Sequence, residues 1–108
     1  MVDHITKTLF KTLKERKIFN TDKSYTAQLL NNPNLLAKKI GEESTELIID
    51  LVSNNKTGVI NESADLLYHL IVSWVSSGVH PEEIWDELSK RTLKSGIEEK
   101  KSRKEINE

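Results

Sequence analysis

Two groups of acidic residues stand at spacings that could bring carboxylates together around a metal ion. One segment carries Glu42, Glu43 and Glu46, and a second carries Glu62 and Asp65. Side chains three positions apart lie on the same face of a helix, so Glu43 would project with Glu46 and Glu62 with Asp65. Carboxylate oxygens are the preferred ligands of hard divalent cations. The pattern predicts a site for Mg²⁺, with Mn²⁺ as the alternative ion, and the expected metal ligands are Glu43, Glu46, Glu62 and Asp65.

The two acidic segments must face each other for such a site to form. Segments 34–52 and 59–77 both show helical periodicity, and the break between them over residues 53–58 predicts an antiparallel helical hairpin. The midpoints of the two acid pairs average to position 54, which lies inside that break. We therefore expect the two pairs at nearly the same height across the hairpin.

An acidic helix face that is merely solvated is the alternative interpretation of these residues. The chain has 17 acidic residues, and pairs at helical spacing often arise by chance in such a composition. Two features favour the metal site, because Glu43 lies in an apolar stripe and Asp65 is followed at once by an apolar run. Carboxylates facing one another without a cation would repel and would be costly to desolvate. Gly41, beside the first acids, either lets a ligand or a partner helix approach closely or is simply tolerated.

The remaining elements are also predicted to be helical, so the expected fold class is all-α, a bundle of four to five helices. Apolar residues at steps of three and four predict a first helix over residues 3–17. A short helix or turn is expected over 24–30. A last helix is expected over 81–96, with Pro81 at its start and Gly78 in the left-handed cap before it. We expect one domain over residues 1–95 and a charged, frayed or disordered tail over 96–108.

Composition excludes several classes of chemistry. The 108 residues contain no cysteine, which removes disulfide scaffolds, thiolate zinc sites and thiol nucleophiles and fits a cytoplasmic location. Sixteen basic and 17 acidic residues give a net charge of −1, so no global positive field favours nucleic acid. The longest apolar segment, 66–75, is far shorter than the ~20 residues of a membrane span. We expect neither nucleic-acid nor membrane partners.

Segment 59–77 also indicates how the chain assembles. Its apolar residues cover nearly all sides of the helix, and such a helix must be buried on all sides. Short helices in one small chain cannot easily enclose it, so we expect a homodimer whose interface completes the core. A monomer with one apolar face is the alternative. Trp74 and Trp85 lie on apolar faces and are expected in the core, not as platforms for base stacking.

At its acidic segments the sequence resembles a known enzyme family. Residues 39–46, Lys-Ile-Gly-Glu-Glu-Ser-Thr-Glu, and 62–70, Glu-Ser-Ala-Asp-Leu-Leu-Tyr-His-Leu, resemble phosphoribosyl-ATP pyrophosphatase, one of the MazG-like all-α nucleotide pyrophosphohydrolases. Residues 24–30 look like the Ser-Tyr-Thr-Ala-x-Leu segment of that branch, and residues 87–91 are similar to its C-terminal helix. The resemblance extends over residues 5–92 and implies a MazG-like helical bundle.

The resemblance implies a Mg²⁺-dependent hydrolysis. Phosphoribosyl-ATP would be cleaved between its α- and β-phosphates to phosphoribosyl-AMP and pyrophosphate, the second step of histidine biosynthesis. By position, the metal ligands would be Glu43, Glu46, Glu62 and Asp65, and Glu42 would be an outer ligand or the base that orients the attacking water. The charged substrate also requires cations, for which the choices are Lys39 first and then Lys38 and Arg91.

Several residues carry two interpretations. Ser24, Tyr25 and Thr26 would either help to hold the nucleotide or form a structural turn. His69, one helical turn after Asp65, would be either a satisfied core histidine or a partner of the metal ligands.

Two other functions compete with the first. A housecleaning pyrophosphohydrolase acting on nucleoside triphosphates, including deoxynucleotides, would share the metal site and differ in its base and ribose contacts. A non-catalytic helical dimerisation module would leave the acids solvated, and it predicts no Mg²⁺ binding and no change of stability on acid-to-amide substitution.

Overall fold

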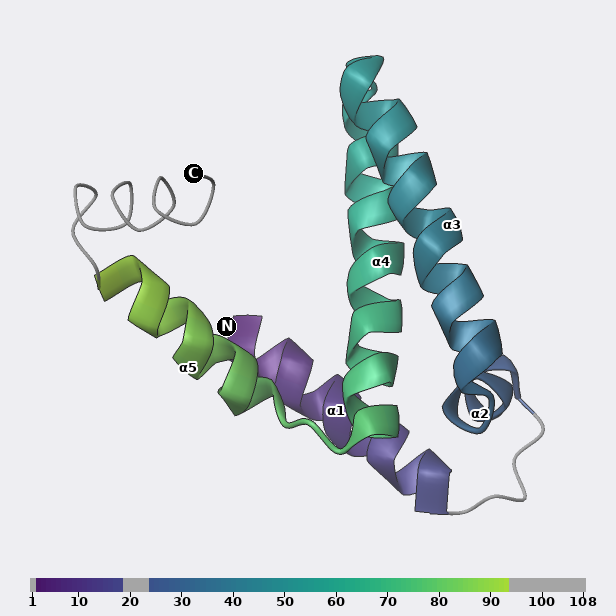
Figure 1. The fold of residues 1–108 in the computed structure, drawn as a ribbon, viewed down its shortest axis with the longest axis vertical. Coiled ribbons are helices and arrows are strands. Elements are labelled where there is room, and N and C mark those ends of the chain that lie inside the picture. The colour runs from purple at the N-terminus through teal and green to yellow at the C-terminus, as the bar shows by residue number, and fades with distance from the viewer. Residues whose placement is uncertain (1, 19–23, 94–108) are drawn as a thin grey trace, which may run out of the picture.

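The computed structural model describes residues 2–18 and 24–93, and these residues form five α-helices and no β-strand (Figure 1). In chain order the helices are α1 (Val2–Ile18), α2 (Tyr25–Leu30), α3 (Pro33–Val52), α4 (Lys56–Ser77) and α5 (Pro81–Leu93). The predicted all-α fold class is confirmed. The predicted end of the last helix at 96, the domain boundary and the tail over 96–108 lie outside the described residues.

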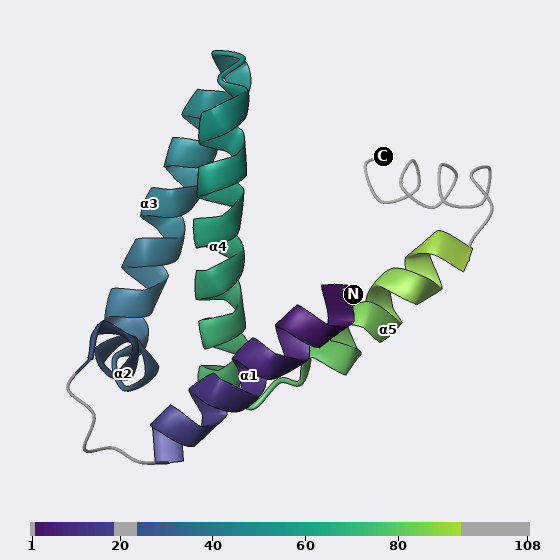
Figure 2. The same ribbon diagram turned by 180° about the vertical axis from the view of Figure 1, so that it is seen from behind.

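Helices α3 and α4 form the predicted antiparallel hairpin and stand side by side (Figures 1 and 2). The chain reverses over residues 53–55, where Asn54 has a left-handed φ of 58°, which asparagine tolerates better than most residues. Asn55 then caps α4, because its side chain accepts a hydrogen bond from the Gly58 amide at 3.0 Å. Helix α4 consequently begins at Lys56, so the predicted start at residue 59 and the predicted break through residue 58 are wrong.

Gly58 lets the two helices approach each other near the turn. A Cβ at this position would stand 2.5 Å from the carboxyl group of Asp50 on α3. Asp50 is also tied to the cap, because its main-chain oxygen accepts a hydrogen bond from the Asn55 amide at 2.9 Å. Its carboxylate accepts a second, longer one from the Asn55 side chain at 3.4 Å. The turn therefore fixes the relative height of α3 and α4.

The core lies at the foot of the hairpin, where α1 crosses α4 and α2 contacts α1, α3 and α4 (Figure 2). The apolar face predicted for the first helix contributes Leu13, and α2 contributes Leu29, which is fully buried. The core consists of Leu13, Leu29, Leu30, Leu36, Ile71, Val72 and Val75. None of the helices within the described ranges combines the length and the apolar character that a membrane span requires.

The upper part of the hairpin exposes large apolar side chains. On α3, Ile49 is 57% exposed and Val52 is 74% exposed, and on α4 Ile60 is 60% exposed. Leu67, on the helix expected to need burial on all sides, is 43% exposed. One chain thus leaves α4 partly uncovered, as the sequence indicates, and the homodimer that would cover it remains a prediction.

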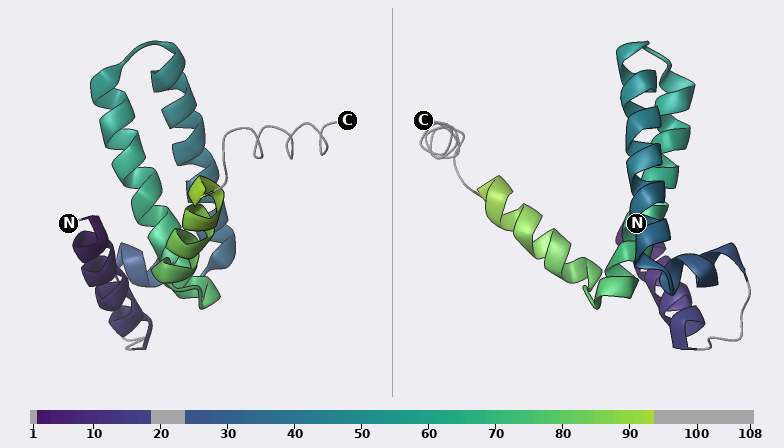
Figure 3. Two further views of the ribbon diagram at one scale, coloured as in Figure 1. Left: turned by 90° about the vertical axis from the view of Figure 1, so that its left-hand side faces the viewer. Right: turned by 45° about the vertical axis from the view of Figure 1, so that its right-hand side comes forward.

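Helix α5 leaves the bundle after a left-handed turn. Gly78 has a φ of 71°, which is the cap expected there, and Pro81 begins α5. Helix α5 then leads away from the α3–α4 hairpin (Figure 3). Trp85 on α5 meets Trp74 on α4 edge to face, with ring centroids 6.0 Å apart. Trp74 packs against the core as predicted, whereas Trp85 is half-buried and contacts Trp74 rather than the core cluster.

Candidate metal centre

Three carboxylates meet midway along the hairpin. Glu43 comes from α3, whereas Glu62 and Asp65 come from α4. Each offers one oxygen, and these three oxygens lie within 4.8 Å of one another. The meeting follows from local geometry, because positions 62 and 65 share one face of α4 and the turn around Asn54 sets Glu43 at their height. The structure thus brings together three of the four predicted metal ligands.

Two oxygens of this cluster lack the donors that buried carboxylates normally have. Oε2 of Glu43 and Oε2 of Glu62 are buried and have no hydrogen-bond partner among the described residues. A buried acceptor without a partner is destabilising, and a buried negative charge is more so. Either a proton shared between the acids or a cation can supply the missing partner.

The electrostatics of Glu62 match this arrangement. Its pKa is raised from the ordinary 4.5 to about 7, first because the protonated carboxyl can donate a hydrogen bond to the Glu43 carboxylate and next by burial. A hydrogen bond with Glu46 and the negative charges of Glu46 and Glu43 raise the pKa further. A shared proton therefore partners the two acids below neutral pH, and a divalent cation would displace it. A set of metal ligands made of carboxylate oxygens alone fits Mg²⁺ or Mn²⁺.

Glu46 and Glu42 lie at the edge of the cluster. Glu46 is exposed and interacts with Glu62 across the hairpin, although it is not one of the three residues whose oxygens are mutually close. Glu42 is exposed and pairs with Lys39, whose Nζ lies 3.6 Å from Glu42 Oε2. Lys39, which the sequence predicts to contact the charged substrate, thus lies beside one of the predicted acids.

A shallow hollow on α3 opens next to these acids. Its volume is about 550 Å³, and it is lined by Lys38, Gly41, Glu42, Thr45 and Glu46. These positions share one face of the helix because they are separated by steps of three, four or one. Thr45, whose hydroxyl donates to the main-chain oxygen of Gly41 at 3.0 Å, is not among the residues predicted from the sequence. Its spacing of four from Gly41 is the sequence signal that places Thr45 on this face of the helix.

The segment predicted either to hold the nucleotide or to form a turn has structural contacts. Ser24 caps α2 by accepting a hydrogen bond from a first-turn amide at 3.2 Å. The Tyr25 hydroxyl lies 2.9 Å from Nε2 of His69, and the Thr26 hydroxyl lies 2.6 Å from the Tyr68 hydroxyl. These contacts support the structural interpretation by tying α2 to α4, while a nucleotide contact of this segment remains a prediction.

His69 links α2 to the metal centre. It is only 7% exposed, and its Nδ1 lies 2.7 Å from the main-chain oxygen of Asp65. Because a carbonyl oxygen only accepts, Nδ1 carries the proton, and Nε2 of the neutral ring accepts from the Tyr25 hydroxyl. His69 is thus a satisfied core histidine, and its role as a partner of the metal ligands remains a prediction.

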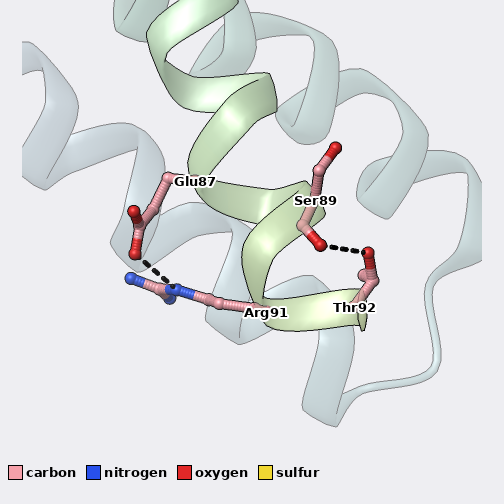
Figure 4. A network of polar contacts seen from close by, with 4 residues as sticks. All are labelled: Glu87, Ser89, Arg91 and Thr92. Carbon is pink, nitrogen blue, oxygen red and sulfur yellow. Dashed lines mark hydrogen bonds and ion pairs between the residues drawn. The ribbon is translucent and has the colours of Figure 1, made fainter. Parts of the chain in front are cut away.

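Arg91 lies apart from the cluster. Its Nε is 3.4 Å from Oε1 of Glu87 on the same helix, and the Thr92 hydroxyl donates to the main-chain oxygen of Ser89 nearby (Figure 4). Helix α5, which carries Arg91, leads away from the α3–α4 hairpin (Figures 1 and 3). A contact between Arg91 and the substrate remains a prediction.

Comparison with known proteins identifies the family of this chain. The family model described as phosphoribosyl-ATP pyrophosphohydrolase matches residues 6–92, which include all five acids. A phosphoribosyl-ATP pyrophosphatase from Paramagnetospirillum magneticum is 46% identical over 96 residues, which is 88% of this chain and 88% of that protein. Proteins of the same name from Gluconobacter oxydans and Azospirillum brasilense are 45% and 42% identical, over 88% and 89% of this chain and 72% and 87% of their own lengths. The chain therefore belongs to the phosphoribosyl-ATP pyrophosphohydrolase family, enzymes of histidine biosynthesis that hydrolyse a phosphoanhydride bond of a small nucleotide.

Proposed function

We propose that this chain catalyses the Mg²⁺-dependent hydrolysis of the α–β phosphoanhydride of 1-(5-phosphoribosyl)-ATP. The products would be 1-(5-phosphoribosyl)-AMP and pyrophosphate, in the second step of L-histidine biosynthesis. The observation that carries this proposal is the cluster of Glu43, Glu62 and Asp65, with two buried oxygens that lack donors, in a chain of this family. Mn²⁺ is expected to substitute because it shares the preference for oxygen ligands.

The two helices of the hairpin would hold the ion between them. Glu43 on α3 and Glu62 and Asp65 on α4 supply the closest oxygens, and exposed Glu46 is the fourth candidate ligand. When bound, a divalent ion supplies positive charge against the phosphate oxygens and favours the ionisation of water. The protein holds the acids in fixed positions, because they project from packed helices and the turn fixes the relative height of those helices.

The residues at the edge of the cluster would act on water and on the substrate's charge. We assign Glu42 one of two roles, orienting the attacking water or acting as an outer ligand of the metal. Its side chain is exposed and pairs with Lys39 at the edge of the cluster. Lys39 and Lys38 would oppose the negative charge of the triphosphate. Water adds to one phosphorus of the α–β anhydride, the bond from that phosphorus to the bridging oxygen breaks, pyrophosphate leaves, and the proton that the water loses passes to Glu42 or to solvent. Such a reaction asks for positioning and charge stabilisation more than for covalent chemistry by the protein.

Pyrophosphate release from phosphoribosyl-ATP tests the proposal. The purified protein would be assayed with Mg²⁺, with Mn²⁺ and with EDTA, beside ATP and a panel of deoxynucleoside triphosphates. Glu62→Gln removes a charge from the cluster at nearly constant size, and the matched control Glu15→Gln removes one from the exposed face of α1. We expect metal-dependent release that is unchanged in the control and at least about 100-fold slower in Glu62→Gln.

Two results would contradict the proposal at different levels. Release from deoxynucleoside triphosphates alone would keep the metal centre and make the chain a housecleaning pyrophosphohydrolase. No release from any nucleotide, together with no Mg²⁺ binding in calorimetry, would remove the metal centre and leave a helical scaffold.

We further propose that the chain works as a homodimer joined through its upper hairpin. Monomeric proteins rarely leave many large apolar side chains exposed together, and the exposed ones on these two helices are Ile48, Ile49, Leu51, Val52, Ile60 and Leu67. In sedimentation velocity, Ile49→Glu should convert a dimer to a monomer, whereas Ile5→Glu on α1 should not. A wild-type monomer would contradict the proposal. A cytoplasmic location remains a prediction from the cysteine-free sequence.

A further inference from the structure

Tyr25 is an exposed aromatic side chain on α2, at the foot of the hairpin (Figure 1). It is 47% exposed, whereas the other phenylalanine, tyrosine and tryptophan side chains within the described ranges are half-buried. The largest of these rings, Trp74 and Trp85, contact each other where α5 begins. Tyrosine combines an apolar ring with a polar hydroxyl and is enriched at surfaces that meet a partner molecule. The hydroxyl of Tyr25 has its partner in His69, so the exposed ring is the part that lacks one.

His69 holds the Tyr25 ring by its hydroxyl end. The hydroxyl lies 2.9 Å from Nε2 of the histidine, the ring planes are nearly perpendicular at 81°, and the ring centroids are 6.1 Å apart. The two rings thus meet through the hydroxyl and the nitrogen, and the histidine does not cover a face of the tyrosine. Because His69 is buried and bonded to the backbone of α4, it fixes a ring that stays nearly half exposed.

The fixed ring lies beside the carboxylate cluster. His69 follows Asp65 by four residues and Glu62 by seven, which places it about 6 Å and about 10 Å farther along α4. These spacings put the three residues on one face of α4, and Asp65 on that face is exposed. Tyr25 therefore stands next to the face that carries the two acids, one to two helical turns from them.

A nucleotide fits between the acids and this ring. With its phosphates at a cation on the cluster, its base would lie one ribose away, which is a gap of similar size. In the opposite direction, toward the turn of the hairpin, the exposed large side chains of α3 and α4 are aliphatic, as at Ile49 and Ile60. The aromatic surface near the acids within the described ranges is thus on the α2 side.

We infer that the ring of Tyr25 is the platform on which the base of the nucleotide substrate stacks, while its hydroxyl fixes the ring through His69. Because the phosphates must be held at the carboxylates, this platform rests on the proposed function. An aromatic ring recognises a base by its π-face and not by its edge. The proposed substrate carries its second ribose on the edge of the purine, which leaves the faces of the base free for stacking.

Tyr25→Leu and Tyr25→Phe test the platform, with Tyr68→Phe as the matched control. Tyr25→Leu removes the ring and the hydroxyl, Tyr25→Phe removes only the hydroxyl, and the control removes the hydroxyl that lies 2.6 Å from Thr26 on α2. Two ligands are titrated in Mg²⁺: an ATP analogue whose α- and β-phosphates are joined by a methylene group, and inorganic tripolyphosphate, which has no base. We expect the Kd of the analogue to be about 5- to 150-fold higher in Tyr25→Leu than in Tyr25→Phe, the range that base stacking supplies. Tripolyphosphate should bind equally to these two variants, and the control should bind both ligands as the wild type does.

The comparison between Tyr25→Leu and Tyr25→Phe isolates the ring, because both variants lack the bond to His69. Equal affinities of the two variants for the analogue would overturn the platform and leave the enzyme activity standing. A loss of the same size for both ligands in Tyr25→Leu would assign the ring to the phosphates or to the fold, and would also overturn the platform. A loss confined to the analogue, in a chain unable to cleave phosphoribosyl-ATP, would support the platform and refute the substrate. A wild type that binds neither ligand would overturn the platform and the proposed function together.

Discussion

Glu62 should make the metal-free protein less stable as the pH rises. The pKa of this carboxyl is about 7 in the fold against an ordinary 4.5, chiefly because it shares a hydrogen bond with Glu43. Between these values the folded chain binds more protons than the unfolded chain, so the free energy of unfolding decreases with rising pH. The stabilising contribution of the protonated acid is complete below pH 4.5 and is lost as the pH passes through about 7.

The size of the effect follows from the two pKa values. Roughly midway between them, the side chain is about 95% protonated in the folded chain and about 5% in the unfolded chain, a difference of about 0.9 proton. Urea denaturation in EDTA from about pH 5 to about pH 8 measures this difference as the pH slope of the free energy of unfolding. The glutamine of Glu62→Gln cannot titrate. The pH slope of the free energy of unfolding should therefore be smaller in this variant by the equivalent of about 0.9 proton, whereas Glu15→Gln should show the wild-type slope.

Equal slopes for the wild type and Glu62→Gln would refute the shared proton. Magnesium provides a second check, because a cation that displaces the proton should bind more tightly as the pH rises. At a free concentration 100 times its Kd, Mg²⁺ should stabilise the fold by about 2.7 kcal/mol. Stabilisation by Mg²⁺ that is greater at pH 5 than at pH 8 would contradict competition between proton and cation.

Three substitutions test the scaffold that holds the site. Leu29→Ala, at a fully buried side chain, should lower the free energy of unfolding by about 2–5 kcal/mol in urea, and a loss below that range would mean that the foot of the hairpin is loosely packed. Gly78→Ala forces a Cβ into a backbone with φ of 71° and should lower it by about 1–2 kcal/mol, whereas an unchanged Tm would rule out this turn conformation. Tyr25→Phe removes the hydroxyl that bonds to His69 and should lower it by about 0.5–1.5 kcal/mol, an effect that should vanish when His69 is already replaced by alanine.

The hairpin and its acids could be predicted because the information is local. Helical spacing sets the face on which each acid lies, and the midpoint near Asn54 sets their common height. The start of α4 could not be obtained in the same way. Positions 56–58 carry no apolar residue, so periodicity does not reveal that they are helical. The cap at Asn55 and the close approach of Gly58 to Asp50 decide that boundary.

Contacts between distant segments could not be predicted from spacing. The Tyr25–His69 bond joins residues 44 positions apart and depends on how α2 docks against α4. Lys17 on α1 is similar, because its Nζ donates to the main-chain oxygens of Val75 at 3.2 Å and Ser76 at 3.4 Å, at the end of α4. A cation is favourable at a helix C-terminus, but the sequence alone does not say which helix it will meet. The direction of α5, the helix that carries Arg91, likewise depends on the turn at Gly78.

The position of the cluster within the hairpin explains why its charge must be neutralised rather than avoided. Above it, Asp50, Asn55 and Gly58 lock the turn, and below it the core and His69 hold α4 in place. Spreading the helices to relieve the repulsion of the acids would break the hydrogen bonds of the turn above the cluster or the core packing below it. The remaining ways to lower their energy are to bind a proton, as the raised pKa of Glu62 indicates, or to bind a cation. A rigid hairpin that leaves only these two choices favours a divalent ion whenever the pH is high enough for the proton to leave.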